Sequence, residues 1–280
     1  MIGIIDVGGG LRGVYGAGVF DRCLDEKIEF DCCIGVSAGS ANIASFLGRQ
    51  RGRNYRFYCD YAFHREYMSF SNLFRTGSYI GLDYIYGTLS NEGGRDPLNY
   101  DSIAAFDGIF RIVATDAETA GPHYFGVDDL HRNNYRVFSA SSCIPVVCRS
   151  VEIDGRSYYD GGVADPVPLK KAFELGCDRV VVILTKPKDF IKDSRTDSKG
   201  AALIRRRNSL LAEAVCRRAE VYNKSVELAK KLEKEGKCLI VAPDDCCGVN
   251  TLTKNKSNLD ALYKKGYRDG EKILEFVKNK

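Results

Sequence analysis

Short hydrophobic runs alternate along the chain with longer stretches whose hydrophobic positions recur at helical spacing. Residues 2–7 (IGIIDV) are a β-branched run that ends in three glycines, which predicts a buried strand followed by a tight turn. Residues 14–26 have the spacing of an amphipathic helix. A second apolar run at 30–36 is followed by a helical pattern at 40–49. This repeated strand–turn–helix order is typical of an α/β fold with a parallel sheet.

The remainder of the chain continues the same alternation. We expect an exposed loop over the polar residues 186–199, and the 201–235 span can be one helix or two helices broken near Asn208 and Ser209. No internal repeat or domain boundary is evident, so we expect one domain over residues 1–280, with its C-terminal helices over 201–280. The further expected strands are 109–114, 135–138, 150–153, 180–185 and 237–242, and the further expected helices are 166–175, 201–235 and 257–279.

One segment is unusually aromatic. The chain has 30 aromatic residues, 16 tyrosines and 14 phenylalanines, and residues 55–86 hold eleven of them. Either these rings are core residues of helices that cover the sheet, or the segment of about 55–100 is a cap or lid whose apolar wall holds an acyl chain. A basic cluster beside it can bind anionic lipid headgroups or be a solvated helix end. The cluster consists of Arg49, Arg51, Arg53 and Arg56.

Composition narrows the functional classes. The 280 residues are 44% hydrophobic and 28% charged, which is ordinary for a globular protein, and no window of 18 unbroken apolar residues exists. The N-terminal sequence lacks the basic start of a secretory signal. A net charge of +4 is too small to indicate nucleic acid as a partner.

Cysteine and histidine usage indicates the compartment and argues against a metal. The 11 cysteines include no Cys-x-x-Cys, and the three histidines have no ligand-like spacing. We therefore expect reduced thiols in a cytoplasmic protein, with peripheral contact to a membrane surface left open, and no metal or cofactor. The oligomeric state is left open.

Residues 35–39 read Gly-Val-Ser-Ala-Gly between an expected strand and an expected helix. In such an elbow the serine sits on a sharp turn with its hydroxyl presented outward, and the helix N-terminus favours a developing oxyanion. Gly35 and Gly39 would avoid side-chain clashes across the turn. The sequence thus favours Ser37 as a nucleophile, although a serine that merely fills a turn is the alternative.

A serine nucleophile needs a base, and the histidines are poor candidates. His64, His123 and His131 lie in no supporting motif, and none lies near the C-terminal end, where the α/β-hydrolase triad would place it. Asp160 is a better candidate, because Gly161 and Gly162 after it permit a tight turn and a close backbone approach. Judged from Asp160 and its two glycines alone, an ordinary Asp-Gly turn without a catalytic role is an equally good interpretation.

The glycine turn at 8–13 has two interpretations. Its Gly-x-Gly-x-x-Gly spacing matches the dinucleotide-binding fingerprint, but the acidic residue expected at the end of the second strand is absent, and the serine elbow is there instead. The alternative is a turn whose backbone amides hold an oxyanion. Arg12, within the turn, can orient the loop or meet a phosphate.

Three ordered motifs, GGGLRG (8–13), GVSAG (35–39) and DGG (160–162), together resemble the patatin-like phospholipase family, and more so its compact bacterial members. YYDGGVADPVPL (158–169) and SASSCIPVV (139–147) are also similar to that family. The resemblance implies a three-layer α/β/α fold with a central, mostly parallel sheet. It implies a dyad of Ser37 as nucleophile and Asp160 as base, with motif glycines Gly35, Gly39, Gly161 and Gly162. It also implies an oxyanion hole from Gly8, Gly9, Gly10, Leu11, Arg12 and Gly13.

The function that the resemblance implies is that of a serine acyl hydrolase acting on lipid acyl esters, of the phospholipase A, lysophospholipase or lipid-esterase type, through an acyl-enzyme. The expected partner is a lipid or another acyl-ester substrate. The same dyad could serve acyl transfer or thioester hydrolysis, and the same fold could be a non-catalytic lipid- or nucleotide-binding module. One departure from the family pattern is Val7, which stands where an acidic residue often precedes the glycines; Asp6 lies one position earlier.

Overall fold

A single eight-stranded sheet organises the computed structural model, which describes residues 1–278. The strand order is β5-β6-β3-β2-β1-β7-β8, with β4 paired to β3. The five strands from β3 to β8 in this order are parallel, while β4, β5 and β6 are antiparallel to their neighbours. The strands are β1 (Ile2–Asp6), β2 (Cys32–Val36), β3 (Ile109–Asp116), β4 (Pro122–Phe125), β5 (Val151–Ile153), β6 (Arg156–Asp160), β7 (Arg179–Ile183) and β8 (Cys238–Val241).

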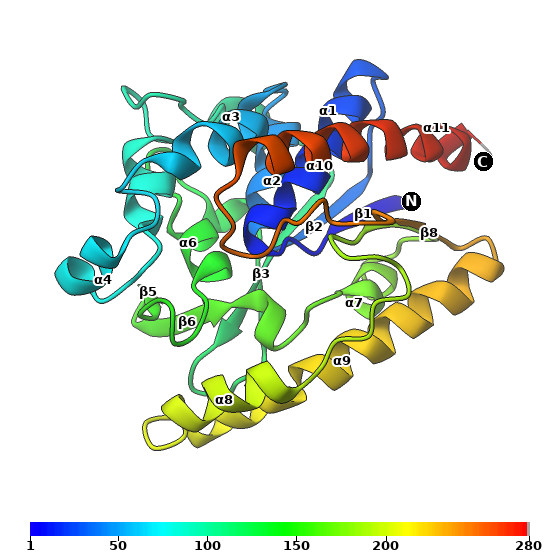
Figure 1. The fold of residues 1–280 in the computed structure, drawn as a ribbon. Helices are drawn as coiled ribbons and strands as arrows, with labels where there is room; N and C mark the ends of the chain where they lie inside the picture. Colours follow the sequence, from blue (N-terminus) through cyan, green and yellow to red (C-terminus); the bar gives the residue numbers. More distant parts are fainter. Residues whose placement is uncertain (279–280) are drawn as a thin grey trace.

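Helices cover both faces of this sheet and make three layers (Figure 1). Helices α1, α2, α3, α10 and α11 lie on one face, and α7, α8 and α9 lie on the other. The helices are α1 (Val14–Asp25), α2 (Ala38–Leu47), α3 (Arg53–Cys59), α4 (Phe70–Thr76), α5 (Tyr100–Ala104), α6 (Arg136–Ser142), α7 (Leu169–Glu174), α8 (Arg195–Ile204), α9 (Ser209–Lys234), α10 (Lys256–Asp269) and α11 (Glu271–Lys278).

The central strands are buried on both faces, which explains their continuous hydrophobic runs. Alternate residues of β1 point to opposite layers: Ile4 packs in the core under α1 and α2, and Ile5 packs in the core under α7 and α9. Burial of this kind stabilises the sheet by about 25 cal/mol for each Å² of apolar surface removed from water. The fold is the three-layer α/β/α arrangement with a mostly parallel sheet that the sequence predicts.

Most predicted elements are confirmed within a few residues, including the break between α8 and α9 after Ile204. The strand predicted at 135–138 is wrong, because these residues begin helix α6. A four-residue apolar run fits a buried helix as well as a strand, and the small residues that follow it bury the same helix against β3 and β6. The loop predicted at 186–199 is wrong over its last five residues, which begin α8. The predicted helix at 257–279 is two helices that meet at Gly270, and residue 279 lies outside the described residues.

The aromatic segment is partly core and partly exposed. Tyr61 and Tyr67 are buried in the core under α3, whereas Phe70 and Phe74 on α4 are exposed, Phe74 by 89%. Helix α4 projects from the body at the end of the sheet that carries β5 (Figure 1). Two more apolar residues of the same segment, Leu82 and Ile85, belong to the site described below.

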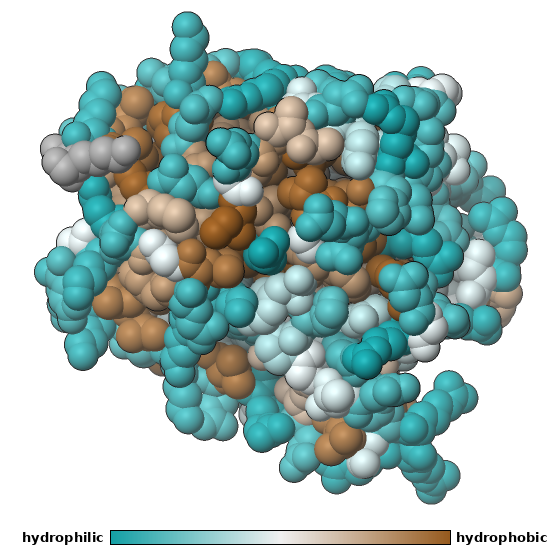
Figure 2. Space-filling model, turned by 180° about the vertical axis from the view of Figure 1, so that it is seen from behind, coloured by the Kyte–Doolittle hydropathy of each residue, from teal (hydrophilic) through white to brown (hydrophobic). Residues whose placement is uncertain are grey.

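The face of the molecule opposite to that seen in Figure 1 is mainly polar. On the face opposite to Figure 1, hydrophilic side chains cover most of the surface, and hydrophobic ones show in separate patches between them (Figure 2). Among the described residues, no helix is both long and apolar enough to cross a bilayer.

The basic cluster next to the aromatic segment is fully ion-paired. Arg49 pairs with Glu29 and Arg51 pairs with Asp25 at the surface. Arg53 is different, because its side chain is only 4% exposed, and its guanidinium donates to the Asp96 carbonyl and to two serine hydroxyls. Burial lowers the pKa of Arg53 to about 10. Arg53 therefore fixes α3 to the loop around Asp96 and is not part of a solvated helix end.

Replacing Arg53 by Ala should lower the free energy of unfolding by about 3–5 kcal/mol, because it leaves the buried Asp96 with a single charged partner and opens a cavity. Arg49→Ala, which removes an exposed ion pair, should cost less than about 1 kcal/mol. Urea unfolding followed by circular dichroism measures both. Equal effects of the two substitutions would contradict the assignment.

Candidate active site

Ser37 lies on a sharp turn where β2 ends and α2 begins. Its backbone angles are φ 54° and ψ −132°, a region that residues with a side chain rarely adopt. The amide of Ser37 donates to the Ser141 hydroxyl at 2.9 Å, and that hydroxyl donates to the Val113 carbonyl at 2.6 Å. A Cβ on Gly39 would lie 2.3 Å from the Asp6 carbonyl oxygen, so α2 can approach β1 this closely only with glycine there. The turn is held from both sides in the strained form that presents the serine.

Asp160 ends β6 and faces Ser37 from the neighbouring part of the sheet. Its side chain is buried, and the Gly162 amide donates to Oδ1 at 2.8 Å. Thr115 on β3 donates to the Asp160 carbonyl at 2.8 Å, which fixes the backbone at this position. Burial raises the pKa of Asp160, while the positive charge of Arg218 and the hydrogen bonds from the Ser37 hydroxyl and Gly162 partly offset this rise. A carboxylate with a raised pKa is a stronger base than an ordinary aspartate.

The glycine turn lies next to the elbow and lines the same cleft. Gly8, Gly9 and Gly10 all have positive φ, and Gly9 at 125° has a conformation that is open to glycine almost alone. Within residues 1–278, the amides of Gly9 and Gly10 donate to no protein acceptor. Unpartnered amides in a turn beside the serine elbow are available to an anion.

Asp6 supports this turn from below. It is fully buried, accepts from the Gly8 amide at 2.9 Å, and accepts from the side chain of Asn42 at 2.8 Å. Asn42 lies on α2 and also donates to the Gly13 carbonyl, at 2.9 Å. Burial raises the pKa of Asp6 to about 6. Although Asp6 lies one position earlier than the acidic residue often found in the family, its carboxylate still connects the glycine turn to α2.

The C-terminal part of the chain fixes the other end of the glycine turn. The Leu11 amide donates to the Thr251 carbonyl at 2.9 Å, and Arg12 donates to the Thr251 hydroxyl at 2.9 Å. The Leu11 amide is thus already used within the protein. Gly13 packs against Tyr58, so a Cβ there would lie 2.4 Å from the Tyr58 hydroxyl.

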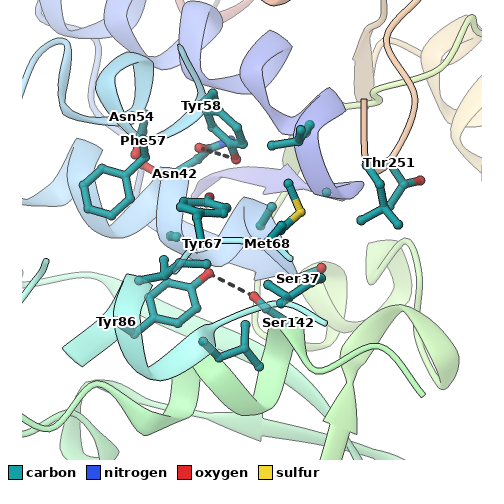
Figure 3. Close-up of a pocket in the computed structure, with 18 of the residues that line it drawn as sticks. Ser37, Asn42, Asn54, Phe57, Tyr58, Tyr67, Met68, Tyr86, Ser142 and Thr251 are labelled. Atoms are coloured by element: carbon teal, nitrogen blue, oxygen red, sulfur yellow. Dashed lines mark hydrogen bonds between the residues drawn. The ribbon is translucent and has the colours of Figure 1, made fainter. Parts of the chain in front are cut away.

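Ser37 stands at the junction of two cavities. The first is a narrow apolar slot of about 70 Å³ between α2, α3 and the aromatic segment. Its far end is formed by Phe57 and Asn54, and Ser37 lies at its other end, near Thr251 (Figure 3). Two hydrogen bonds satisfy polar groups in its wall, from Tyr58 to Asn42 and between Tyr86 and Ser142. Arg53 and Asn54 also line the slot, and both are hydrogen-bonded within the protein. Most of the remaining wall is apolar and includes Met68, Ile80, Leu82, Ile85 and Ile144.

The second cavity is a wider cleft of about 540 Å³ that contains both Ser37 and Asp160. The glycine turn forms one wall, and α9 and the segment after β7 form the opposite side. Unlike the slot, it carries several charged side chains, namely Arg12, Lys186, Lys192, Asp193, Asp197 and Arg218. The serine therefore lies between a space suited to a hydrocarbon chain and a space suited to a polar group.

The structure brings the predicted site residues together: Ser37, Asp160 and the turn at 8–13 line one cleft. None of the three histidines lines either cavity within the described residues. Sequence reasoning missed Asn42, Ser141, Thr251, Lys192 and Arg218. Ser141 lies within the family-like stretch 139–147, but that resemblance assigns it no contact with Ser37. The other four are single polar residues without a motif, so only the fold shows that they reach the site.

The comparisons with known proteins agree with this geometry. The patatin-like phospholipase family model matches residues 7–173, which include the glycine turn, the elbow and the aspartate segment. The chain belongs to the patatin-like phospholipase family. Members of this family are lipid acyl hydrolases. A second family model, a domain of unknown function (DUF6363), matches residues 208–279 and so covers α9, β8, α10 and α11.

Two individual proteins are similar to this member of the patatin-like family. The uncharacterized protein YjjU of Escherichia coli (strain K12) is 34% identical over 191 residues, which cover 66% of this chain and 52% of that protein. The chain therefore spans about half the length of this curated relative. The crystal structure of VipD from Legionella pneumophila is 14% identical, with a TM-score of 0.49 over 98% of this chain and 66% of that chain.

The raised pKa of Asp6 predicts a specific pH dependence of stability. Because its pKa rises from 3.8 to about 6 on folding, the stability that protonated Asp6 contributes is present below pH 4 and is lost as the pH rises through 6. The free energy of unfolding of the wild type relative to Asp6→Asn should therefore fall by about 3 kcal/mol between pH 4 and 7. Urea titrations at several pH values measure this difference. Asp128→Asn, at an exposed position, is the control, and a constant difference for Asp6→Asn would refute the assignment.

Proposed function

We propose that this chain is a serine acyl hydrolase that cleaves carboxylic ester bonds of lipids, with Ser37 as nucleophile and Asp160 as base. The observation that carries the proposal is the strained Ser37, which lines the same cleft as the buried carboxylate of Asp160 and stands at the junction of the slot and the cleft. A serine hydroxyl is a weak nucleophile until a neighbouring base takes its proton. Asp160 is a buried carboxylate that lines the same cleft as Ser37.

In the first half of the reaction, Asp160 takes the proton from Ser37 as Oγ attacks the ester carbonyl. A bond forms between Oγ and the carbonyl carbon, and the carbonyl oxygen becomes an oxyanion. We assign the amides of Gly9 and Gly10 to this oxyanion, because they are unpartnered in the described structure and line the same cleft. The tetrahedral intermediate collapses, the ester C–O bond breaks, and the leaving alcohol takes the proton from Asp160.

In the second half, a water molecule replaces the alcohol. Asp160 takes a proton from the water as its oxygen attacks the acyl-enzyme carbonyl, the bond to Oγ breaks, and the proton returns to Ser37. The helix α2, which begins at Ala38, has its positive end at this turn and favours the negative charge in both halves.

The two cavities indicate how an ester would be oriented. We assign the acyl chain to the apolar slot, because its aromatic and aliphatic wall has its few polar groups already hydrogen-bonded. The leaving alcohol then faces the wide, charged cleft, which is large enough for a polar group and for water. The exposed Phe70 and Phe74 on α4 are candidates for contact with a membrane surface that supplies the lipid.

The proposal predicts that Ser37→Ala and Asp160→Asn lower kcat for short-chain p-nitrophenyl esters by at least about a hundredfold, because one removes the nucleophile and the other the base. Since burial raises the pKa of Asp160, the acidic limb of the wild-type profile of kcat/KM against pH should lie above pH 3.8. Ser71→Ala and Asp128→Asn are matched exposed controls and should keep full activity. Undiminished hydrolysis by folded Ser37→Ala would refute the proposal.

A further inference from the structure

A group of positive side chains from three separate parts of the chain meets beside the catalytic pair. Arg12 comes from the glycine turn, Lys192 from the segment after β7, and Arg218 from the middle of α9. All three line the wide cleft. They lie close enough to repel one another, since Arg218 lowers the pKa of both Arg12 and Lys192, in addition to the larger effect of burial; the pKa of Lys192 is about 8.

The acidic residues of the cleft do not balance these charges. Asp197 pairs with Lys192 at 3.1 Å and lies 3.9 Å from Arg218. Asp193 pairs with Arg195 at the exposed rim, so its negative charge neutralises little of the positive charge inside the cleft. This leaves Asp197 and the catalytic Asp160 to face three cations, and the wall of the cleft carries a surplus of positive charge.

Hydrogen-bonding capacity is also unused at this wall. The buried Nε–H groups of Arg12 and Arg218 donate to no protein acceptor among the described residues. A buried donor without a partner is costly unless a ligand or water satisfies it. A guanidinium group offers a fork of donors that matches the oxygens of a phosphate.

Arg218 is placed on the side of the dyad that the leaving alcohol would occupy. A Cβ added to Gly162 would lie 3.4 Å from Nη2 of Arg218, so the guanidinium lies against the residue whose amide holds the Asp160 carboxylate. The apolar slot opens on the other side of Ser37, toward the aromatic segment. A group bound at Arg218 would therefore be attached to the alcohol part of the ester.

We propose that Arg218 and Lys192 form a subsite for a phosphate group on the leaving alcohol, so that α9, in the region matched by a domain of unknown function, contributes to the substrate specificity of the hydrolase. This inference rests on the proposed function, because it assigns one part of the substrate of the same site. The C-terminal region contributes to the site in two places: α9 carries Arg218, and Thr251 holds the glycine turn through Leu11 and Arg12. A phosphate on Arg218 would also cancel part of the charge that lowers the pKa of Asp160 and would make that base stronger.

The test compares two soluble esters that differ only in the phosphate, 1-hexanoylglycerol 3-phosphate and 1-hexanoylglycerol. In the wild type, kcat/KM should be at least tenfold higher for the phosphate ester. Arg218→Gln and, independently, Lys192→Gln should lower the ratio of the two values about tenfold or more, mainly through KM of the phosphate ester. Arg217→Gln removes the same charge from an exposed neighbour on the same helix and should leave the ratio unchanged.

The ratio separates this role from an effect on Asp160. If Arg218 only tunes the base, Arg218→Gln shifts the pH profiles of both esters equally and leaves the ratio as it was, which would overturn the proposal. An equal loss of the ratio in Arg217→Gln would overturn it as well, because it would show a general effect of charge.

Binding to Ser37→Ala protein tests the subsite without catalysis, and so distinguishes its failure from that of the proposed hydrolase. Calorimetry should show the phosphate ester binding at least tenfold more tightly than 1-hexanoylglycerol, with the difference lost in Ser37→Ala/Arg218→Gln. Competition by inorganic phosphate distinguishes the source of the anion: weak competition supports a lipid phosphate, whereas inorganic phosphate that binds as tightly as the ester would contradict a site for the substrate. Equal binding of the two esters would also overturn the proposal.

Discussion

The backbone strain at Ser37 is the constraint on which the site depends. A serine at φ 54° and ψ −132° is unfavourable by about 1–3 kcal/mol, so the surrounding structure must hold it there. Ser141 of α6, which also donates to β3, does so on one side, and α2 does so through its close approach to β1 at Gly39. Relaxing this turn would move the hydroxyl away from Asp160. The packing of β1, β2, β3 and α2 therefore fixes the geometry of the proposed chemistry.

Burial is the second constraint on the site. It raises the pKa of two carboxylates whose other partners differ. Asp6 is buried with hydrogen bonds and no positive partner, and it serves to hold the glycine turn. Asp160 is buried as well, but the charge of Arg218 keeps the rise of its pKa in check. As the proposed base, Asp160 must be ionised and yet strong enough to take a serine proton, and the charge of Arg218 and burial act on its pKa in these opposite directions. In our proposal the same arginine also binds a phosphate group on the leaving alcohol of the substrate.

The fold and the motif residues of the site could be predicted from the sequence, whereas the residues that surround them could not. The strands β1, β2, β7 and β8 are unbroken apolar runs, which mark a buried parallel sheet, and the family motifs place Ser37 and Asp160 in it. The strand expected at 135–138 failed because a run of four residues does not distinguish a strand from a helix. Arg218 and Thr251 could not be found, since tertiary packing brings them to the cleft from parts of the chain distant in sequence, in the case of Thr251 and Arg12 across 239 residues.

The most direct test of the central claim is the reaction of the purified protein with a fluorophosphonate probe, followed by mass spectrometry of the adduct, in wild type and in Asp160→Asn. The account predicts a single adduct on Ser37 that forms much more slowly in Asp160→Asn, because the serine is activated by that carboxylate. Absence of an adduct in folded wild-type protein, or equal rates with and without the Asp160 carboxylate, would contradict it.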